Sequence, residues 1–248
     1  MVRGVHSDRG DYYAPKVLLA TGGASYPLTG STGDGLKFAK QAGHTVTECR
    51  PSLVPLESPD AYCEQMQGFS LRNVTLSAFE DGKLIYKELG EMLFTHFGIS
   101  GPIVLSCSYK AVDYWQKTKE PLIGSIDFKP ALTPEKLDAR ILRDFEENQN
   151  RDLENTLGAL LPRSMIPVVL RRLEIDPEMQ ANSLTRQKRR TLVELLKAFS
   201  ITITGKRPVA EAIITSGGVK VSEIDPKTMQ SKIVPGLYFA GGRSCTLE

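Results

Sequence analysis

Two short apolar segments near opposite ends of the chain each run directly into a pair of glycines. Lys16–Ala20 (KVLLA) is followed by Thr21 and Gly22-Gly23, and Leu237–Ala240 (LYFA) by Gly241-Gly242. A short continuous apolar run is typical of a strand that is buried on both faces. Glycines after such a strand permit a ligand or another backbone to approach closely. We therefore expect the two strands to meet at one edge of a single sheet, with the intervening residues as an insertion.

The first of these strands leads through a glycine-rich loop, ASYPLTGSTGDG, into a helical pattern. Leu36, Ala39 and Ala42 recur at helical spacing, and Ser31 or Asp34 can cap the helix. In open α/β sheets, ligands bind beyond the carboxyl ends of the strands. The glycines of the loop match neither G-x-G-x-x-G nor a P-loop. An ordinary turn and a ligand-binding loop therefore both remain open.

The middle of the chain follows a β pattern. Val74–Phe79 alternates between apolar and polar residues, and Asp81-Gly82 is a strong hairpin signal before a return strand at Leu84–Tyr86. A further short strand is expected at Met92–Phe94 and another at Leu122–Phe128. Between them, the sequence THFGISGP places a proline where the first turn of a helix accepts one.

His96 lies between the expected short strand and this glycine-rich helix start. A histidine in such a place can donate a proton or act as an electrophile, which makes it a candidate catalytic residue. The other interpretation is a loop histidine that makes a structural hydrogen bond. The sequence leaves both open.

From Thr133 to Phe199 the apolar period becomes helical, with four stripes of the i, i+3, i+4, i+7 kind. The second stripe runs from Leu153 to Leu161 and ends at a proline. Arg186 to Arg190 contains four basic residues, which we interpret as a solvated helix face, with phosphate contact as the alternative. A small helical subdomain inserted after the β region is the simplest account, and the β pattern resumes at Ile201–Thr204.

The overall composition narrows the classes of protein. The 31 basic and 29 acidic residues leave a net charge of +2, which lacks the large basic excess typical of nucleic-acid-binding proteins. No apolar run approaches the roughly 20 residues that span a bilayer, and the N-terminus lacks the plan of a signal peptide. The four cysteines, Cys49, Cys63, Cys107 and Cys245, form no CxxC pair. We therefore expect reduced thiols in a cytoplasmic protein, without a metal site.

Four blocks of the sequence, in order, resemble the YhiN/BaiN family of bacterial FAD-dependent oxidoreductases, flavoproteins also described as aminoacetone-oxidase-like. The blocks are LLATGGASYPLTGSTGDGLKFAKQAGH, PSLVPL, GEMLFTHFGISGP and AEAIITSGGVKVSEIDPKTMQSKIVPGLYFAGG. With the segments between them they cover nearly the whole chain. The resemblance implies an α+β, multidomain fold. Partial Rossmann-like FAD-domain segments at 1–48 and 208–248 would flank a β-barrel-like insert domain at 49–131 and 200–207 and a helical domain at 132–199.

The resemblance also implies which residues lie near FAD. The cofactor-binding candidates are Thr21, Gly22, Gly23, Ser25, Tyr26 and Gly241. Ser25 and Tyr26 would lie towards the flavin or the substrate, Gly241 near the ribityl or pyrophosphate region, and His96 at the border of the substrate space. NAD(P)H is implied as an electron donor. A small molecule, either an amine or an unsaturated ring compound, is implied as the substrate, with no nucleic acid or membrane partner.

Two parts of the family pattern are missing from this sequence. Family members begin with a unit that carries G-x-G-x-x-G, and they have an acidic residue where this chain has Gly242 before RSCTLE. We therefore expect a fragment of a longer oxidoreductase that is incomplete for FAD binding and inactive alone. Unpaired edges of its end strands would favour a homodimer.

Two other functions remain open from the sequence. The chain can be a non-catalytic binding module that retains the insert domain. It can also be a complete enzyme that uses another nucleotide through the GSTGDG loop. Calorimetry against ATP, NADPH and FAD separates this last hypothesis from the others, because only a complete nucleotide site would bind.

Overall fold

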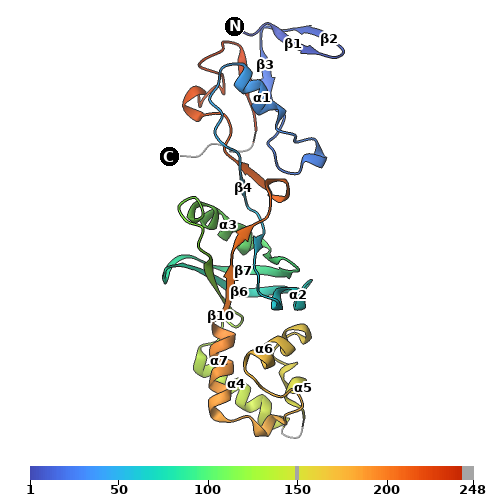
Figure 1. The fold of residues 1–248 in the computed structure, drawn as a ribbon, viewed down its shortest axis with the longest axis vertical. Helices are drawn as coiled ribbons and strands as arrows, with labels where there is room; N and C mark the ends of the chain where they lie inside the picture. The colour runs from blue at the N-terminus through green and yellow to red at the C-terminus, as the bar shows by residue number, and fades with distance from the viewer. Residues whose placement is uncertain (149–150, 242–248) are drawn as a thin grey trace. The chain divides into compact units, whose positions relative to one another are not determined.

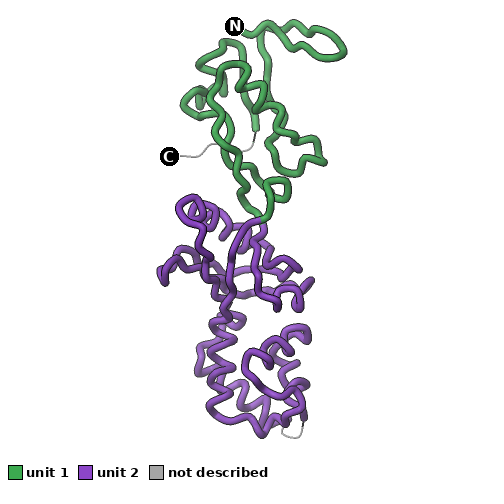
Figure 2. Tube along the Cα trace, in the orientation of Figure 1, with its two compact units in different colours: residues 1–54, 207–248 green, residues 55–206 purple. Residues whose placement is uncertain are grey.

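The computed structural model describes residues 1–148 and 151–241, and the chain divides into two compact units (Figures 1 and 2). Unit 1 combines residues 1–54 with residues 207–248, and unit 2 is the continuous segment 55–206. Unit 2 thus contains both the barrel-like and the helical segments. No helix of the described residues is long and apolar enough to cross a membrane.

The two glycine-terminated strands lie together in unit 1. Strand β3 (Val17–Leu19) pairs in parallel with β13 (Leu237–Phe239), and Val17 lies opposite Leu237. The prediction that these segments meet in one sheet is therefore confirmed. Parallel neighbours require a crossover connection, and here the crossover consists of everything between the two strands.

The prediction that β3 is buried on both faces was wrong. Leu18, in the middle of the strand, is 59% exposed. Among the described residues, the sheet of β3 and β13 has only these two strands. A strand is covered on both faces only where further elements pack on both sides of its sheet, so Leu18 faces solvent.

The rest of unit 1 consists of short elements. These are the hairpin of β1 (Gly4–Ser7) and β2 (Gly10–Tyr13), helix α1 (Asp34–Gln41), and the antiparallel pair of β4 (Arg50–Ser52) and β12 (Ile214–Ser216). Helix α1 follows Gly33, which has φ 77° and supplies no side-chain cap. The expected caps, Ser31 and Asp34, do not occupy that position, because the tight loop turns into the helix through a left-handed glycine.

Unit 2 contains one sheet of seven strands in the order β10-β9-β6-β7-β8-β5-β11, and all neighbours are antiparallel. The strands are β5 (Leu56–Glu57), β6 (Ser70–Glu80), β7 (Lys83–Thr95), β8 (Gly98–Ser100), β9 (Leu122–Asp127), β10 (Phe199–Ile203) and β11 (Gly205–Lys206). The two edge strands, β10 and β11, are separated by Thr204 alone. One continuous segment therefore supplies both edges, which makes the sheet barrel-like although its strand pairing does not close into a ring.

The hairpin of β6 and β7 turns at Asp81 and Gly82, with φ of 47° and 79°. Two positive φ values are the mark of the tight hairpin turn that the sequence predicted. The expectation of two separate strands after the turn was wrong, because β7 is one strand of 13 residues. The segment Lys87–Glu91 lacks apolar alternation, and backbone pairing with β6 holds it in the strand.

The helix that covers this sheet begins as predicted. Helix α3 (Pro102–Tyr114) follows Gly101, has its proline in the first turn, and buries Ile103, Val104 and Cys107. A short helix, α2 (Tyr62–Gln65), contributes the buried Cys63. Burial raises the pKa of Cys63 to about 11 and that of Cys107 to about 12, so both thiols stay protonated near neutral pH. Together with Cys49 they are free thiols, whereas Cys245 lies outside the described residues.

The described residues of the helical part of unit 2 form four α-helices, α4 (Pro134–Glu147), α5 (Leu153–Leu157), α6 (Ile166–Arg172) and α7 (Arg186–Lys197). Thr133 caps α4 as predicted, by accepting a hydrogen bond from the backbone N–H of Lys136. The second apolar stripe is only partly helical, because α5 ends at Leu157 and the buried Leu160 and Leu161 follow in a turn.

Two of the four basic side chains at 186–190 form hydrogen bonds within unit 2. The Arg189 guanidinium donates two hydrogen bonds to the Asp138 carboxylate, at 2.7 and 3.2 Å, and the Lys188 ammonium donates to the Glu174 carbonyl. Arg186 and Arg190 are exposed. This arrangement supports the interpretation of a solvated helix face.

Candidate functional site

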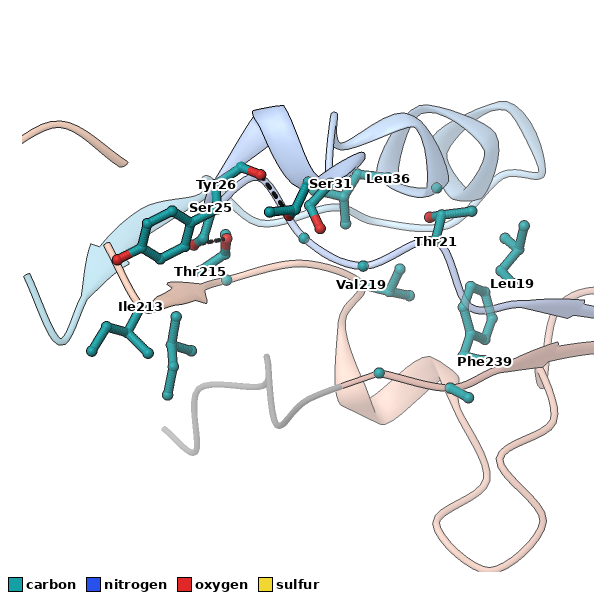
Figure 3. A pocket seen from close by; sticks show the side chains of 18 of the residues that line it. Leu19, Thr21, Ser25, Tyr26, Ser31, Leu36, Ile213, Thr215, Val219 and Phe239 are labelled. Carbon is teal, nitrogen blue, oxygen red and sulfur yellow. Dashed lines mark hydrogen bonds between the residues drawn. The ribbon is translucent and has the colours of Figure 1, made fainter. Parts of the chain in front are cut away.

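A pocket of about 750 Å³ opens within unit 1 (Figure 3). That volume is in the range of small-molecule sites. Its walls come from the ends of β3 and β13, the loop after β3, the start of α1, and the segment around β12. The lining residues are Leu19, Thr21, Gly22, Gly23, Ser25, Tyr26, Thr29, Ser31, Gly35, Leu36, Ile213, Ile214, Thr215, Gly217, Val219, Ile224, Met229, Phe239, Ala240 and Gly241.

The structure brings all six cofactor-binding candidates to this one pocket. Thr21, Gly22, Gly23, Ser25 and Tyr26 follow β3, and Gly241 follows β13. The parallel pairing explains the convergence, because both strands end at the same edge of their sheet. Gly242, where the family has an acidic residue, lies outside the described residues.

Two glycines of the loop permit a close approach of backbone and side chain. Gly22 has φ 76°, and a Cβ atom there would lie 2.7 Å from Ser31 Oγ. A Cβ atom on Gly23 would lie 2.7 Å from Thr215 Oγ1. A larger residue at either position would displace a pocket wall, so the loop needs glycine at both.

Thr215 is a pocket residue that the sequence analysis missed. Its hydroxyl oxygen accepts a hydrogen bond from the backbone N–H of Ala24 at 2.9 Å and lies 2.7 Å from Ser25 Oγ. These contacts tie the loop after β3 to β12, as Figure 3 shows for the hydroxyl pair. A signal was present in the sequence, because the segment AIIT also runs into a glycine pair, as the other two strands do.

The lining combines apolar walls with hydroxyl groups. Eight lining residues have large apolar side chains: Leu19, Leu36, Ile213, Ile214, Val219, Ile224, Met229 and Phe239. Six have a hydroxyl group: Thr21, Ser25, Tyr26, Thr29, Ser31 and Thr215. No lining residue among those that the structure describes is charged. Asp34, next to the lining residue Gly35, is paired with Lys37 at 2.8 Å, and hydrogen bonds from Lys37 and Thr32 lower its pKa.

A Glu–His–Ser set, in which His44 and Ser231 are buried, stands behind one wall of the pocket. His44 Nδ1 lies 3.0 Å from Glu223 Oε2, and His44 Nε2 lies 2.8 Å from Ser231 Oγ. The imidazole also packs edge-on against Phe239, a lining residue, with ring centroids 4.9 Å apart. Hydrogen bonds from the Thr45 side chain and backbone, and then from His44, lower the pKa of Glu223 below its ordinary value, against the effect of burial, which raises it.

This set resembles a nucleophilic triad by distance, although His44 is far from Glu223 and Ser231 in the sequence and the three residues form no local motif. Its serine is nevertheless unsuited to attack a substrate. Ser231 is 5% exposed, and its oxygen accepts hydrogen bonds from the backbone N–H groups of Ile233 and Val234. With its lone pairs occupied, Ser231 donates its hydroxyl hydrogen to His44, and the set is structural.

His96 does not join this group of residues. It lies in the turn between β7 and β8 of unit 2, is exposed, and does not line the pocket. Its ring packs edge-on against that of Phe97 at 5.0 Å. In the part of the chain that the structure describes, no group of three or more His, Cys, Asp or Glu residues is arranged to hold a metal ion.

A family described as "HI0933-like protein barrel and H2TH domain" matches residues 50–214, which is more than half of the chain. The chain belongs to the HI0933-like family. Members of this family are FAD-dependent oxidoreductases of the YhiN/BaiN kind, so the resemblance drawn from the four sequence blocks is confirmed. The word "barrel" in the description agrees with the barrel-like sheet of unit 2.

Three curated relatives match almost the whole chain. Two are named "Ribosomal RNA dihydrouridine synthase": the Haemophilus influenzae protein is 34% identical over 91% of this chain, and the Escherichia coli protein 30% identical over 91%. A "3-dehydro-bile acid delta(4,6)-reductase" from Clostridium scindens is 25% identical over 96%. The chain spans about half the length of these relatives, 53%, 53% and 58% respectively.

Proposed function

We propose that the pocket of unit 1 holds the isoalloxazine ring of FAD and that the chain takes part in a flavin-dependent reduction. One observation carries this proposal. The six residues that the family resemblance assigned to FAD, from both ends of the sequence, converge on a single pocket. Family membership supports the choice of cofactor, because family members are FAD-dependent.

The composition of the pocket fits the ring end of FAD. Apolar side chains such as Leu19, Ile213 and Phe239 offer contact to a flat aromatic ring, and the hydroxyl of Ser25 can meet one of its polar atoms. The lining holds no charged side chain among the described residues. The proposal therefore concerns the ring and does not assign a site to the diphosphate.

A bound flavin supplies the hydride chemistry, and the protein supplies position, polarity and shelter from water. The apolar walls would exclude water from the bound ring. The loop after β3, fixed to β12 through Thr215, would hold Ser25 against that ring. NAD(P)H is the proposed electron donor.

The proposed reaction is the addition of hydrogen across a carbon–carbon double bond that is conjugated to a carbonyl group. The names of the relatives share this chemistry: a dihydrouridine has two more hydrogens than uridine, and a delta(4,6)-reductase removes double bonds beside a 3-keto group. Small unsaturated ring compounds belong to this class. We propose a small molecule of this kind as the substrate.

The cofactor proposal is tested by titrating the ¹⁵N-labelled chain with FAD and following backbone amide shifts, which also detect the weak binding expected when the pocket holds only the ring end of FAD. We expect saturable shifts for the amides of Gly22, Gly23 and Ser25. Two matched variants place a carboxylate on the surface of unit 1: Ile213→Glu inside the pocket lining and Val221→Glu outside it. Their wild-type side chains are 50% and 44% exposed.

The Ile213→Glu variant should lose the FAD response, because an anionic group in an apolar pocket disfavours the ring. The Val221→Glu variant should keep it. Equal responses of the two variants, or a wild-type chain whose pocket amides stay unmoved at millimolar FAD, would show that the pocket is not a flavin site. ATP and NADPH, titrated in parallel, test the alternative of another nucleotide.

A second candidate substrate is a uridine within ribosomal RNA. The relatives named for RNA are 34% and 30% identical, whereas the bile-acid reductase is 25% identical, and this order favours RNA. The net charge of +2 favours the small molecule. A gel-shift assay with ribosomal RNA at two salt concentrations, beside an amide-shift titration with a 4-en-3-one steroid, separates the two classes.

A further inference from the structure

The hydroxyl groups of Ser25 and Thr215 share one hydrogen bond, but each of them has a hydrogen that it can donate. Thr215 Oγ1 accepts the N–H of Ala24 at 2.9 Å, and the two hydroxyl oxygens are 2.7 Å apart. Neither hydroxyl has a further partner among the described residues. Whichever hydroxyl donates to the other, one hydroxyl hydrogen is left without a protein acceptor.

The burial of the two side chains decides which hydrogen that is. Thr215 is 7% exposed, so an unused donor there would be buried and costly. Ser25 is only half-buried and lines the pocket. The lower-energy arrangement therefore has Thr215 donating to Ser25 Oγ, and the Ser25 hydroxyl hydrogen directed to the pocket space.

We propose that Ser25 donates a hydrogen bond to the ligand of this pocket, and that Thr215 is the positioning residue that orients it. This inference rests on the proposed function, so the acceptor is a carbonyl oxygen or a ring nitrogen of the isoalloxazine ring. The Ala24 N–H, the Thr215 O–H and the Ser25 O–H form a chain of donors that point the same way. The hydrogen bonds in such a chain strengthen one another by polarisation.

The orientation of this chain has a consequence for the reaction. A donor aimed at the ring stabilises the negative charge that the ring gains on reduction. Ser25 would therefore act on the chemistry of the cofactor as well as on its affinity. Thr215 contributes no contact of its own to the reacting atoms.

The test compares four variants of the whole chain by the same ¹⁵N titration with FAD: Ser25→Ala, Thr215→Val, Thr215→Ser and Thr47→Val. Thr47 is the matched control. Its hydroxyl also links the two ends of the sequence, through the carbonyl and the N–H of Gly218 at 3.0 Å each, and Thr47 does not line the pocket.

We expect Ser25→Ala to weaken FAD binding by about fivefold to tenfold, the loss of one hydrogen bond. Thr215→Val should weaken it at least as much, whereas Thr215→Ser and Thr47→Val should stay within about twofold of the wild type. The Ala24 amide resonance is the structural readout. It should keep its position in Ser25→Ala, which retains the bond to Thr215, and move in Thr215→Val. The visible absorption band of bound FAD should shift in Ser25→Ala.

Three results would overturn the inference. Wild-type affinity in Ser25→Ala would show that Ser25 donates nothing to the ligand. Weaker binding in Ser25→Ala with a displaced Ala24 amide would show that Ser25 only shapes the loop. A wild-type chain that binds no FAD would remove the proposed function as well, whereas the first two results leave that function standing.

Discussion

Replacing His44 by alanine should destabilise unit 1 selectively. The imidazole side chain is fully buried and joins residues from both ends of the sequence, with Glu223 on one nitrogen and Ser231 on the other. It also supports Phe239, a wall of the pocket. Its removal therefore breaks two of the hydrogen bonds that join the C-terminal segment to the loop after α1.

The magnitude follows from the two groups that lose a partner. The Ser231 hydroxyl is left as a buried donor without an acceptor, which costs about 1–3 kcal/mol. The lost edge contact with the Phe239 ring adds about 0.5–1.5 kcal/mol. We expect a total loss of about 2–4 kcal/mol in the free energy of unfolding of unit 1. No stabilisation is assigned to Glu223, whose carboxylate reaches solvent.

The assay monitors urea unfolding with two probes. Hydrogen exchange of the amides of Ser231 and Leu237 reports on unit 1, and tryptophan fluorescence reports on unit 2. The single tryptophan, Trp115, lies in unit 2 and reports on that unit alone. The control is His6→Ala, because the His6 side chain is 85% exposed and pairs only with Asp11. Unchanged protection of the unit 1 amides in His44→Ala would refute the reasoning, as would an equal shift of the Trp115 transition.

Three further predictions concern single positions. Gly23→Ala should lower the stability of unit 1 by about 1–3 kcal/mol, since its Cβ would overlap a pocket hydroxyl; an unchanged urea midpoint would contradict this. The hydrogen bond from Arg189 holds the pKa of Asp138 below 3.8, so this pair stabilises unit 2 above that pH and the effect fades as the pH falls through the lowered pKa. Asp138→Asn should therefore cost about 1 kcal/mol at pH 7 and flatten the acid limb of the stability curve; a parallel curve would argue against the pair. Leu76→Ala should cost about 2–5 kcal/mol in unit 2, measured by tryptophan fluorescence, because the side chain is fully buried; a loss below about 1 kcal/mol would mean that the site collapses on the cavity.

The sequence predicted those elements whose local signals agree with their tertiary surroundings. The two glycine-terminated strands, the Asp81-Gly82 turn, and the Thr133 cap are all found where the residues indicated. Each depends on a local backbone requirement that few residue types meet. Such requirements can be read from a single sequence.

The wrong predictions concern the length of β7 and the burial of β3. In both cases the presence or absence of a neighbouring strand determines the structure. Strand β7 continues through Lys87–Glu91 because β6 supplies backbone partners, which no side-chain pattern reveals. Leu18 is exposed because its sheet has few strands, and apolar composition alone does not give the number of neighbours. Tertiary pairing outweighs local preference in both cases.

Only part of the candidate site could be predicted from the sequence. The residues after β3 and β13 were found through the family motifs, whereas Thr215, Ser231 and His44 were not. Ala24 and Thr215 are 191 residues apart in the sequence, and nothing local joins them. Only the fold shows that their contacts exist.

The parallel pairing of β3 with β13 also orders events during synthesis. All of unit 2 has been translated once residue 206 is complete, while the partners of β3 and β4 are still to be made. Among the described residues, β3 therefore meets its strand partner only after the whole of unit 2 has been synthesised. A premature stop codon between β12 and β13 would yield a polypeptide that contains the whole of unit 2 but lacks the strand that pairs with β3 in this structure.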